Sequence, residues 1–138
     1  MRQVAIEAVV ADRIRLPGRI PKVAVTDWMS KGDIFLNTTN VDNTPISVLE
    51  AMACGLCVVS TNVRGMPYLL EHEHDALLVP ADDPTLMATA VRCLLTEPGL
   101  AERLSHNARQ KAEQFDWSII LPQWEALLTS VMTRNTHE

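Results

Sequence analysis

The sequence predicts an α/β fold, in which a parallel sheet carries helices on both faces. Apolar, strand-like runs alternate along the chain with segments of helical periodicity, and the connections between them are short. One run, at residues 56–60, has a β-branched centre, which is typical of a strand buried on both faces. With 138 residues, 47% of them hydrophobic, the chain is long enough for one domain with a buried core.

The N-terminal half is expected to alternate between helices and strands. Pro45 follows Thr44 as a first helical residue follows its N-cap, and Gly55 is placed to end that helix. The expected elements are a helix at 2–11, a strand at 13–16, a helix at 21–29, a strand at 33–37, a polar loop at 38–44, a helix at 45–54 and a strand at 56–60.

The C-terminal half is expected to add one strand and several helices, which gives about four strands in total. Asp83 and Pro84 again have the form of an N-cap and first helical residue, and Pro98 is expected to open the next helix. The expected elements are a turn at 61–67, a short helix up to 71, a strand at 76–79, helices from 84 and from 98, and a helix at 118–133. Core-facing residues of the helix from 84 are Leu86, Met87, Ala90, Val91, Leu94 and Leu95. No linker interrupts the chain, so we predict a single domain at 1–138, with residues 118–138 as a C-terminal helix and tail.

Composition and charge exclude several classes of function. Residues 1–69 carry seven basic and six acidic side chains, and residues 70–138 carry five and eleven, so the basic footprint that nucleic acid requires is missing. The longest run without a charged residue has 13 positions, whereas a transmembrane helix needs about 20, so no membrane-spanning helix is expected in this sequence. Three cysteines indicate a reduced, cytoplasmic protein. Cys54 and Cys57 have CxxC spacing, but Cys54 ends a helix, so we expect small buried hydrophobes there rather than a redox pair.

The candidate site lies where parallel strands end, because ligands of such sheets bind at the carboxyl ends of the strands. The helix from Pro45 presents free N–H groups and a positive dipole end to the loop before it, which favours an anion. Glu50 lies about one turn further on, and an ionised carboxylate can accept two hydrogen bonds from a vicinal diol. The alternative is that Asp42 and Thr44 only cap the helix and that Glu50 is solvated.

The residues around this helix indicate a family. The block Glu-Ala-Met-Ala-Cys-Gly at 50–55 stands between two apolar strands, and here the chain closely resembles the C-terminal half of family 4 (group 1) retaining glycosyltransferases. The resemblance covers nearly the whole chain, through segments at 12–18, 33–37, 45–55, 58–61, 65–67, 76–83, 108–109 and 115–117. It implies the two-domain GT-B architecture, of which this chain is expected to be a partial, Rossmann-like C-terminal domain that is truncated at its N-terminus.

The resemblance also implies a function in carbohydrate biosynthesis, and it implies a role in donor binding or catalysis for each of two carboxylates. The family's Glu-x7-Glu motif falls on Asp42 and Glu50. Glu50 matches the residue that holds the ribose hydroxyls of a nucleotide-sugar donor. Asp42 matches the residue beside the donor sugar and is therefore the candidate catalytic residue, although its side chain is one methylene shorter than the family's Glu.

Further donor-binding residues follow from the same resemblance. The stretch whose backbone amides are expected to meet the donor diphosphate consists of Pro45, Ile46 and Ser47, and Thr44 before it is also expected among the donor-binding residues. The turn at 62–65 resembles a glycine pair of the family, but Arg64 replaces one glycine and Gly65 keeps the other. Arg64 either adds a phosphate contact or is simply an exposed arginine.

The resemblance implies that important parts of the enzyme are missing. In the family, the N-terminal domain supplies the acceptor pocket, and an Arg/Lys pair near the start of the C-terminal domain meets the diphosphate. By this comparison the chain lacks both, together with two strands of the sheet. We therefore expect a transferase fragment that binds the donor without being active alone, and whose partner is the missing N-terminal domain or another copy of the chain.

Two other functions stay open at this point, a non-catalytic binding or interaction module and a nucleotide-sugar epimerase relative. No cofactor and no metal are expected. His72 and His74 lie with acidic neighbours in a polar turn, but such a cluster lacks the fixed geometry of a metal site. A cytoplasmic location is expected, with a peripheral position at the inner face of the membrane left open.

Overall fold

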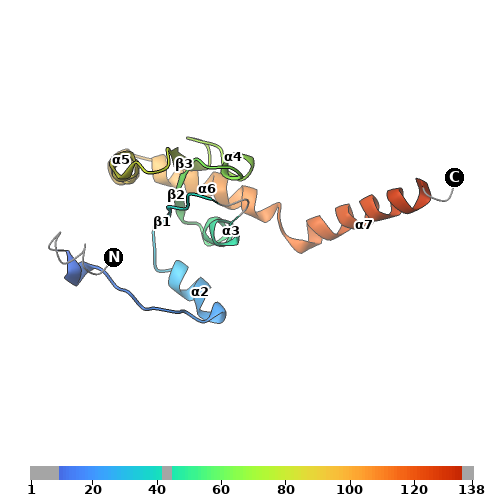
Figure 1. Ribbon diagram of the computed structural model, residues 1–138, viewed down its shortest axis with the longest axis horizontal. Helices are drawn as coiled ribbons and strands as arrows, with labels where there is room; N and C mark the ends of the chain where they lie inside the picture. The colour runs from blue at the N-terminus through green and yellow to red at the C-terminus, as the bar shows by residue number, and fades with distance from the viewer. Residues whose placement is uncertain (1–9, 42–44, 135–138) are drawn as a thin grey trace.

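The computed structural model describes residues 10–41 and 45–134, and it is an α/β structure built on a parallel sheet (Figure 1). The sheet has three strands in the order β1-β2-β3. The elements are η1 (Ala11–Arg13), α2 (Lys22–Met29), β1 (Ile34–Asn37), α3 (Ile46–Ala53), β2 (Cys57–Thr61), α4 (Met66–Leu69), β3 (Ala76–Val79), α5 (Pro84–Thr96), α6 (Leu100–Glu113) and α7 (Trp117–Arg134).

The central strand β2 divides the core into two halves. All five of its residues are buried, as the β-branched run predicts. Val58 packs with Val48 and Met52 of α3, whereas Val59 on the opposite face packs with Leu94 of α5. Successive side chains of a strand point to opposite faces, so one strand serves both halves. The predicted α/β fold with helices on both faces is therefore confirmed.

Helix α6 closes the amino ends of the strands. Its Arg103 donates from a guanidinium nitrogen to the carbonyl of Glu73 at 2.7 Å, and Asn107 donates to the carbonyl of His74 at 2.8 Å. Lys111 forms an ion pair with Asp75, whose side chain is fully buried just before β3. These contacts leave the opposite, carboxyl ends of the strands as the open edge of the sheet.

The predicted strand at 13–16 is wrong, and the described residues contain three strands rather than about four. Ile14 has an extended backbone, but the segment runs apart from the sheet (Figure 1). A strand requires a hydrogen-bonded neighbour, and this segment has none in the described part of the chain. The helix predicted at 2–11 falls mostly outside the described residues, and residues 11–13 form a 3₁₀ turn.

Boundary residues agree with the predictions in part. Gly55 follows α3 with a φ of +79°, a conformation that glycine adopts without strain. The Asp83 side chain accepts a hydrogen bond from the Leu86 amide at 2.9 Å and so caps α5 as expected. Helix α6 begins at Leu100 rather than at Pro98. Within α5, Leu94 is buried as predicted, but Leu86 and Leu95 are exposed, because the buried stripe is narrower than the apolar pattern.

The last helix, α7, extends away from the sheet (Figure 1). From Trp117 to Met132 all its side chains are exposed except that of Ile120, which is half-buried. This confirms a C-terminal helix close to the predicted 118–133. Within the described ranges, no helix combines the length and the apolar character needed to cross a membrane.

Candidate functional site

The carboxyl edge of the sheet is held together by a short polar link. The side-chain nitrogen of Asn37, at the end of β1, donates to the hydroxyl of Ser60 in β2 at 3.0 Å. The same nitrogen lies 3.7 Å from the sulfur of Met66, the first residue of α4. Met66 and Val48 of α3 belong to one buried cluster. The link therefore brings the start of α3 and the turn before α4 to the same edge of the sheet.

The N-terminus of α3 has backbone donors for which the described residues supply no acceptor. Pro45 is its N-cap, with an extended backbone (φ −70°, ψ 115°) and no side-chain cap. The Val48 amide donates to the Pro45 carbonyl at 3.0 Å, and the Leu49 amide lies 3.5 Å from the same oxygen. The preceding amides, of Ile46 and Ser47, lie before the first bond of the helix and belong to exposed residues. They are available to an anion.

Pro45 itself cannot act as the sequence predicts. Its ring is buried, and a proline nitrogen carries no hydrogen, so it cannot donate to a diphosphate. It is also the N-cap rather than the first helical residue, so α3 begins one position later than expected. Of the predicted diphosphate-binding stretch, the described donors are therefore Ile46 and Ser47.

Glu50 is half-buried on the outer side of α3. Val48, Ala51 and Met52 face the core, whereas Glu50 follows Ile46 by four residues and shares its side of the helix. The carboxylate accepts no hydrogen bond from any residue that the structure describes. An ionised carboxylate with both oxygens free can accept a pair of hydroxyl groups one turn from the free amides.

The turn between β2 and α4 adds a positive charge. Arg64 is exposed, has a φ of +40° and forms neither an ion pair nor a hydrogen bond within the described chain. A positive φ is uncommon for a residue with a side chain, so this backbone favours glycine. Gly65 is the N-cap of α4, with an ordinary φ of −75°. The turn thus presents an unpaired guanidinium at the edge that also holds the start of α3.

Two predicted site residues, Asp42 and Thr44, lie outside the described residues. Their predicted roles, beside the donor sugar and at the start of the helix, therefore stay predictions. The loop that leads toward them is described up to Val41, and it runs from the end of β1 over the carboxyl edge of the sheet.

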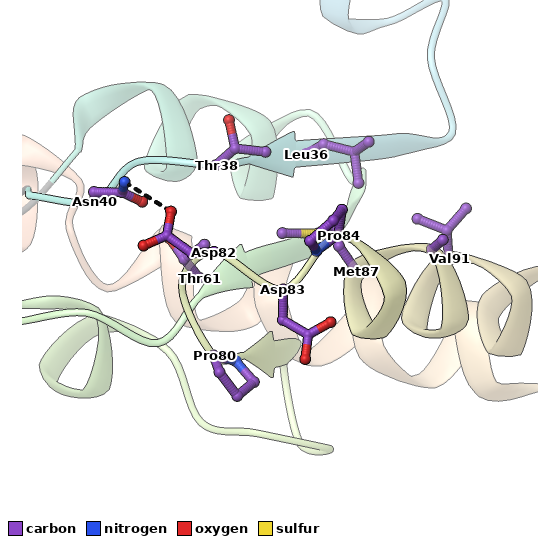
Figure 2. Close-up of a pocket in the computed structure, with 11 residues that line it drawn as sticks. Leu36, Thr38, Asn40, Thr61, Pro80, Asp82, Asp83, Pro84, Met87 and Val91 are labelled. Carbon is purple, nitrogen blue, oxygen red and sulfur yellow. Dashed lines mark hydrogen bonds between the residues drawn. The ribbon is translucent and has the colours of Figure 1, made fainter. Parts of the chain in front are cut away.

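A cavity that the sequence does not predict lies on the α5 side of the same edge (Figure 2). Its volume is about 500 Å³, within the range of small-molecule pockets. Met87 and Val91 of α5 line one side, and Leu36 of β1 lines another. Asn40 donates to the carboxylate of Asp82 at 3.2 Å, which joins the loops that follow β1 and β3.

None of the predicted site residues that the structure describes lines this cavity. It shares the loop after β1 with the predicted site, but Glu50, Ile46, Ser47 and Arg64 belong to elements on the α3 side. The Asp82-Asp83 pair after an apolar strand is the one available signal, and the sequence assigns Asp83 only a capping role. The contact between Asn40 and Asp82 joins residues that are 42 positions apart, so local patterns do not reveal it.

The prediction of two small buried residues at the CxxC pair is confirmed for Cys57 alone. Cys57 is buried at the start of β2, and its thiol donates to the carbonyl of Ala101 at 3.1 Å. Burial raises the pKa of the Cys57 thiol above its usual value, which disfavours the reactive thiolate. Cys54 is half-buried at the end of α3 and is not joined to Cys57. In the described ranges no three histidine, cysteine or acidic side chains gather into a metal-binding group.

Comparison with known proteins identifies the family. The sequence profile of "Glycosyl transferases group 1" matches residues 1–97. A D-inositol 3-phosphate glycosyltransferase of Streptomyces bingchenggensis is 28% identical over 117 residues, which are 85% of this chain and 26% of that protein. The D-inositol 3-phosphate glycosyltransferase 2 of Catenulispora acidiphila is 30% identical over 109 residues, which are 79% of this chain and 26% of that protein.

Solved structures agree with this result. Sucrose-phosphate synthase from Thermosynechococcus elongatus superposes with a TM-score of 0.85 at 26% identity, over 96% of this chain and 33% of that one. HepE of Anabaena, solved with UDP-glucose, superposes with a TM-score of 0.83 at 22% identity, over 93% of this chain and 35% of that one, a likeness of fold. The chain therefore spans about a quarter to a third of the length of these proteins, and it belongs to the group 1 glycosyltransferase family with the fold of a GT-B C-terminal domain.

Proposed function

We propose that this chain binds the nucleotide-diphosphate sugar donor of a retaining glycosyl transfer at the carboxyl edge of its sheet. The observation that carries the proposal is the start of α3, where no described residue bonds the amides of Ile46 and Ser47 or the carboxylate of Glu50, which follows one turn later. Membership of the group 1 family supports it, because the two relatives named above are glycosyltransferases.

In this proposal the diphosphate meets the N-terminus of α3. The helix dipole and the two free amides favour negative charge there, and this preference needs no basic side chain. Arg64, which has no described partner on the turn between β2 and α4, supplies a positive charge at the same edge. A diphosphate held between backbone donors and one guanidinium matches the chemistry of both groups.

Glu50 then binds the ribose. Its two carboxylate oxygens accept hydrogen bonds from the 2′- and 3′-hydroxyls, and its place one turn beyond the amides separates the ribose from the diphosphate along the helix. Asp42, whose place precedes the helix in the sequence, is proposed to lie beside the donor sugar. No metal or cofactor is assigned a role in this proposal, because the N-terminus of α3 and the Arg64 guanidinium are proposed to balance the negative charge of the diphosphate.

Transfer itself requires more than this chain is proposed to provide. Retaining transfer needs the acceptor hydroxyl held in line with the anomeric carbon, and the chain corresponds to about a quarter to a third of its relatives' length. We therefore propose that acceptor binding belongs to a further domain, and that the chain alone binds the donor without turnover. A second candidate is a binding module that never takes part in transfer.

Titration calorimetry of the purified chain with UDP, GDP and UDP-glucose tests the proposal. We expect binding, and we expect Glu50→Gln to weaken it about tenfold, because a carboxylate bond to a hydroxyl is stronger than an amide bond. Glu102→Gln is the matched control, since it makes the same change on α6, near the amino ends of the strands. Equal affinities of the parent and Glu50→Gln would contradict the ribose assignment.

A transfer assay separates the two candidates. With the donor that binds in calorimetry, the chain is mixed with the separately expressed N-terminal domain of a group 1 relative and with that relative's acceptor. Product that forms only in the presence of both proteins supports a donor-binding part of a transferase. Donor binding without product in any such mixture favours the binding module.

A further inference from the structure

The polar turn at 71–75, between α4 and β3, has no part in the proposed donor site. It carries two histidines and three carboxylates, yet in the described ranges no three such side chains form a metal-binding group. Its backbone lies against the strand that follows. The Glu73 amide donates to the Ala76 carbonyl at 2.8 Å, and His72 forms an isolated parallel bridge with Ala76. The turn therefore covers the start of β3.

Strand β3 is an edge strand of the described sheet, so only one of its sides faces another strand. The Asn62 amide, directly after β2, donates to the Val79 carbonyl at 2.7 Å, so the backbone groups of Val79 point toward β2. Backbone groups of successive strand residues point to alternate sides, and those of Leu78 therefore point outward. An unpaired outward N–H group on an edge strand is a ready partner for a further strand.

The outward amide of Leu78 is bound by a side chain rather than by backbone. It donates to Nδ1 of His72 at 2.9 Å. A neutral imidazole has one nitrogen that donates and one that accepts, whereas both nitrogens of the protonated ring donate. The bond to Leu78 therefore requires a neutral ring whose proton is on Nε2. A proton on Nδ1 would set two N–H groups against each other.

Charged groups of three elements surround His72. In the turn itself, Nε2 of His72 lies 3.9 Å from a carboxylate oxygen of Glu73. Glu97 and Cys93 at the end of α5, and Arg103 of α6, line one groove of about 480 Å³ together with these two residues. A hydrogen bond with the Glu97 side chain raises the pKa of the Cys93 thiol, so this group is neutral. The Glu73 carboxylate is thus a partner for a protonated His72 that has lost its bond to Leu78.

The other ionisable groups of the turn are directed mainly to α6. The Asp75 carboxylate accepts from the Glu71 amide at 2.8 Å and pairs with Lys111. Nδ1 of His74 lies 3.9 Å from the same carboxylate. The Glu71 side chain is exposed and forms no hydrogen bond or ion pair within the described chain. None of these groups takes the place of His72 at the edge of β3.

We propose that His72 is a pH-sensitive latch on the outer edge of β3, closed when its imidazole is neutral and open when it is protonated. Imidazole gains its second proton between about pH 8 and pH 5. Only the neutral ring accepts from Leu78, so the bond is complete at the alkaline end of this range and is lost as the pH falls. The latch goes beyond donor binding, since it shares no residue with the start of α3.

NMR of the ¹⁵N-labelled full chain tests the latch directly. We expect a scalar coupling across the hydrogen bond between the Leu78 amide nitrogen and Nδ1 of His72 at about pH 8, and its loss at about pH 5. The protection factor of the Leu78 amide against hydrogen exchange, which corrects for the intrinsic effect of pH, should fall about tenfold between the same two values, as expected for one hydrogen bond.

Two variants separate the latch from a general loosening of the turn. In His72→Asn the side-chain oxygen is as many bonds from the backbone as Nδ1 and accepts at any pH, so protection of Leu78 should persist in acid. His74→Asn is the matched control, because the side chains of His72 and His74 are 53% and 57% exposed and the described chain shows no amide bound to His74. It should behave like the parent.

Three results would each overturn the proposal: no coupling at about pH 8, equal protection of Leu78 in the parent at both pH values, or a loss of protection in acid that is as large in His72→Asn as in the parent. A pH dependence that disappears in His74→Asn would assign the effect to His74 and would also contradict the latch. The dispersion of each ¹H–¹⁵N spectrum shows that the variant is folded.

Discussion

Two regions of this molecule expose different kinds of chemical groups to solvent. At the carboxyl edge of the sheet, the exposed groups are polar and stand on a packed core: the amides of Ile46 and Ser47 begin a helix whose inner residues Val48 and Met52 are fully buried. Along α7 the free groups are apolar and no core lies behind them. The first region is suited to hold a small polar ligand in one geometry, and the second is suited to be covered.

If the two regions differ in this way, the stability of the fold comes from the sheet and its packed helices rather than from α7. Leu94 and Leu95 test that assumption, because they are neighbours on α5 and expose 5% and 72% of their surface. Leu94→Ala is expected to lower the free energy of unfolding by about 2–5 kcal/mol. Leu95→Ala should change it by less than about 0.5 kcal/mol.

Urea unfolding followed by circular dichroism measures both values. The experiment is done at low micromolar concentration, so that association contributes little to stability. Similar losses of unfolding free energy in the two variants would show that α5 does not pack as described. The contrast between a well-packed sheet and an uncovered α7 would then be contradicted.

A smaller effect is expected at Arg64, where stability and binding are opposed. Arg64→Gly removes a side chain from a backbone with a φ of +40°, and we expect the free energy of unfolding to rise by roughly 0.5–1 kcal/mol. The same change removes the unpaired guanidinium, so affinity for UDP should fall about two- to fivefold. Arg92→Gly is unsuitable as a control because it lies within a helix; Arg64→Lys keeps the charge and the strain.

Thermal unfolding and calorimetry of Arg64→Gly and Arg64→Lys separate the two effects. A loss of stability in the glycine variant would contradict the strained turn. Unchanged affinity in that variant would assign Arg64 to the second interpretation that the sequence allows, an exposed arginine without a phosphate contact.

The smallest effect is expected at the start of α7. The amide and hydroxyl of Ser118 both donate to the Asp116 carboxylate, at 2.8 and 2.6 Å, and these bonds hold the pKa of Asp116 below its usual value. A lowered pKa means that this stabilisation is complete above the ordinary value of 3.8 and is lost as the pH falls through the folded-state value. Helicity of α7 should therefore decrease slightly in acid.

Circular dichroism between pH 6 and pH 2 measures this change, with Asp116→Asn as the control that cannot ionise. The parent should lose more helicity than the variant over that interval. Equal curves would show that the Asp116 cap does not hold the first turn of α7.

Much of the fold follows from local patterns. Burial of β2 on both faces follows from its β-branched run, and the capping of α5 by Asp83 follows from the Asp-Pro pair. The strand predicted at 13–16 is wrong. The residue pattern there shows only that the segment could form a strand, whereas a strand exists only when its backbone is hydrogen-bonded to a neighbouring strand. Local sequence carries no information on whether that neighbour is present.

The arrangement of the candidate-site residues that the structure describes was also predictable in part. Placing Ile46, Ser47 and Glu50 on one helix needs only the helix boundary and its period. The cavity beside Asn40 and Asp82 was not predictable, because it depends on two loops that meet only in the folded sheet. The positive φ of Arg64 also depends on the folded turn, which the arginine itself does not favour.

The proposed function depends on a nucleoside diphosphate that binds at the start of α3. A ¹H–¹⁵N NMR titration of the chain with UDP and with GDP, read residue by residue, shows where each nucleotide binds. We expect the amides of Ile46, Ser47 and Gly65 to shift in a saturable way with at least one of them, while those of α7 stay unchanged. Shifts confined to the cavity beside Asp82 and Asp83, or no saturable shift with either nucleotide, would contradict the account.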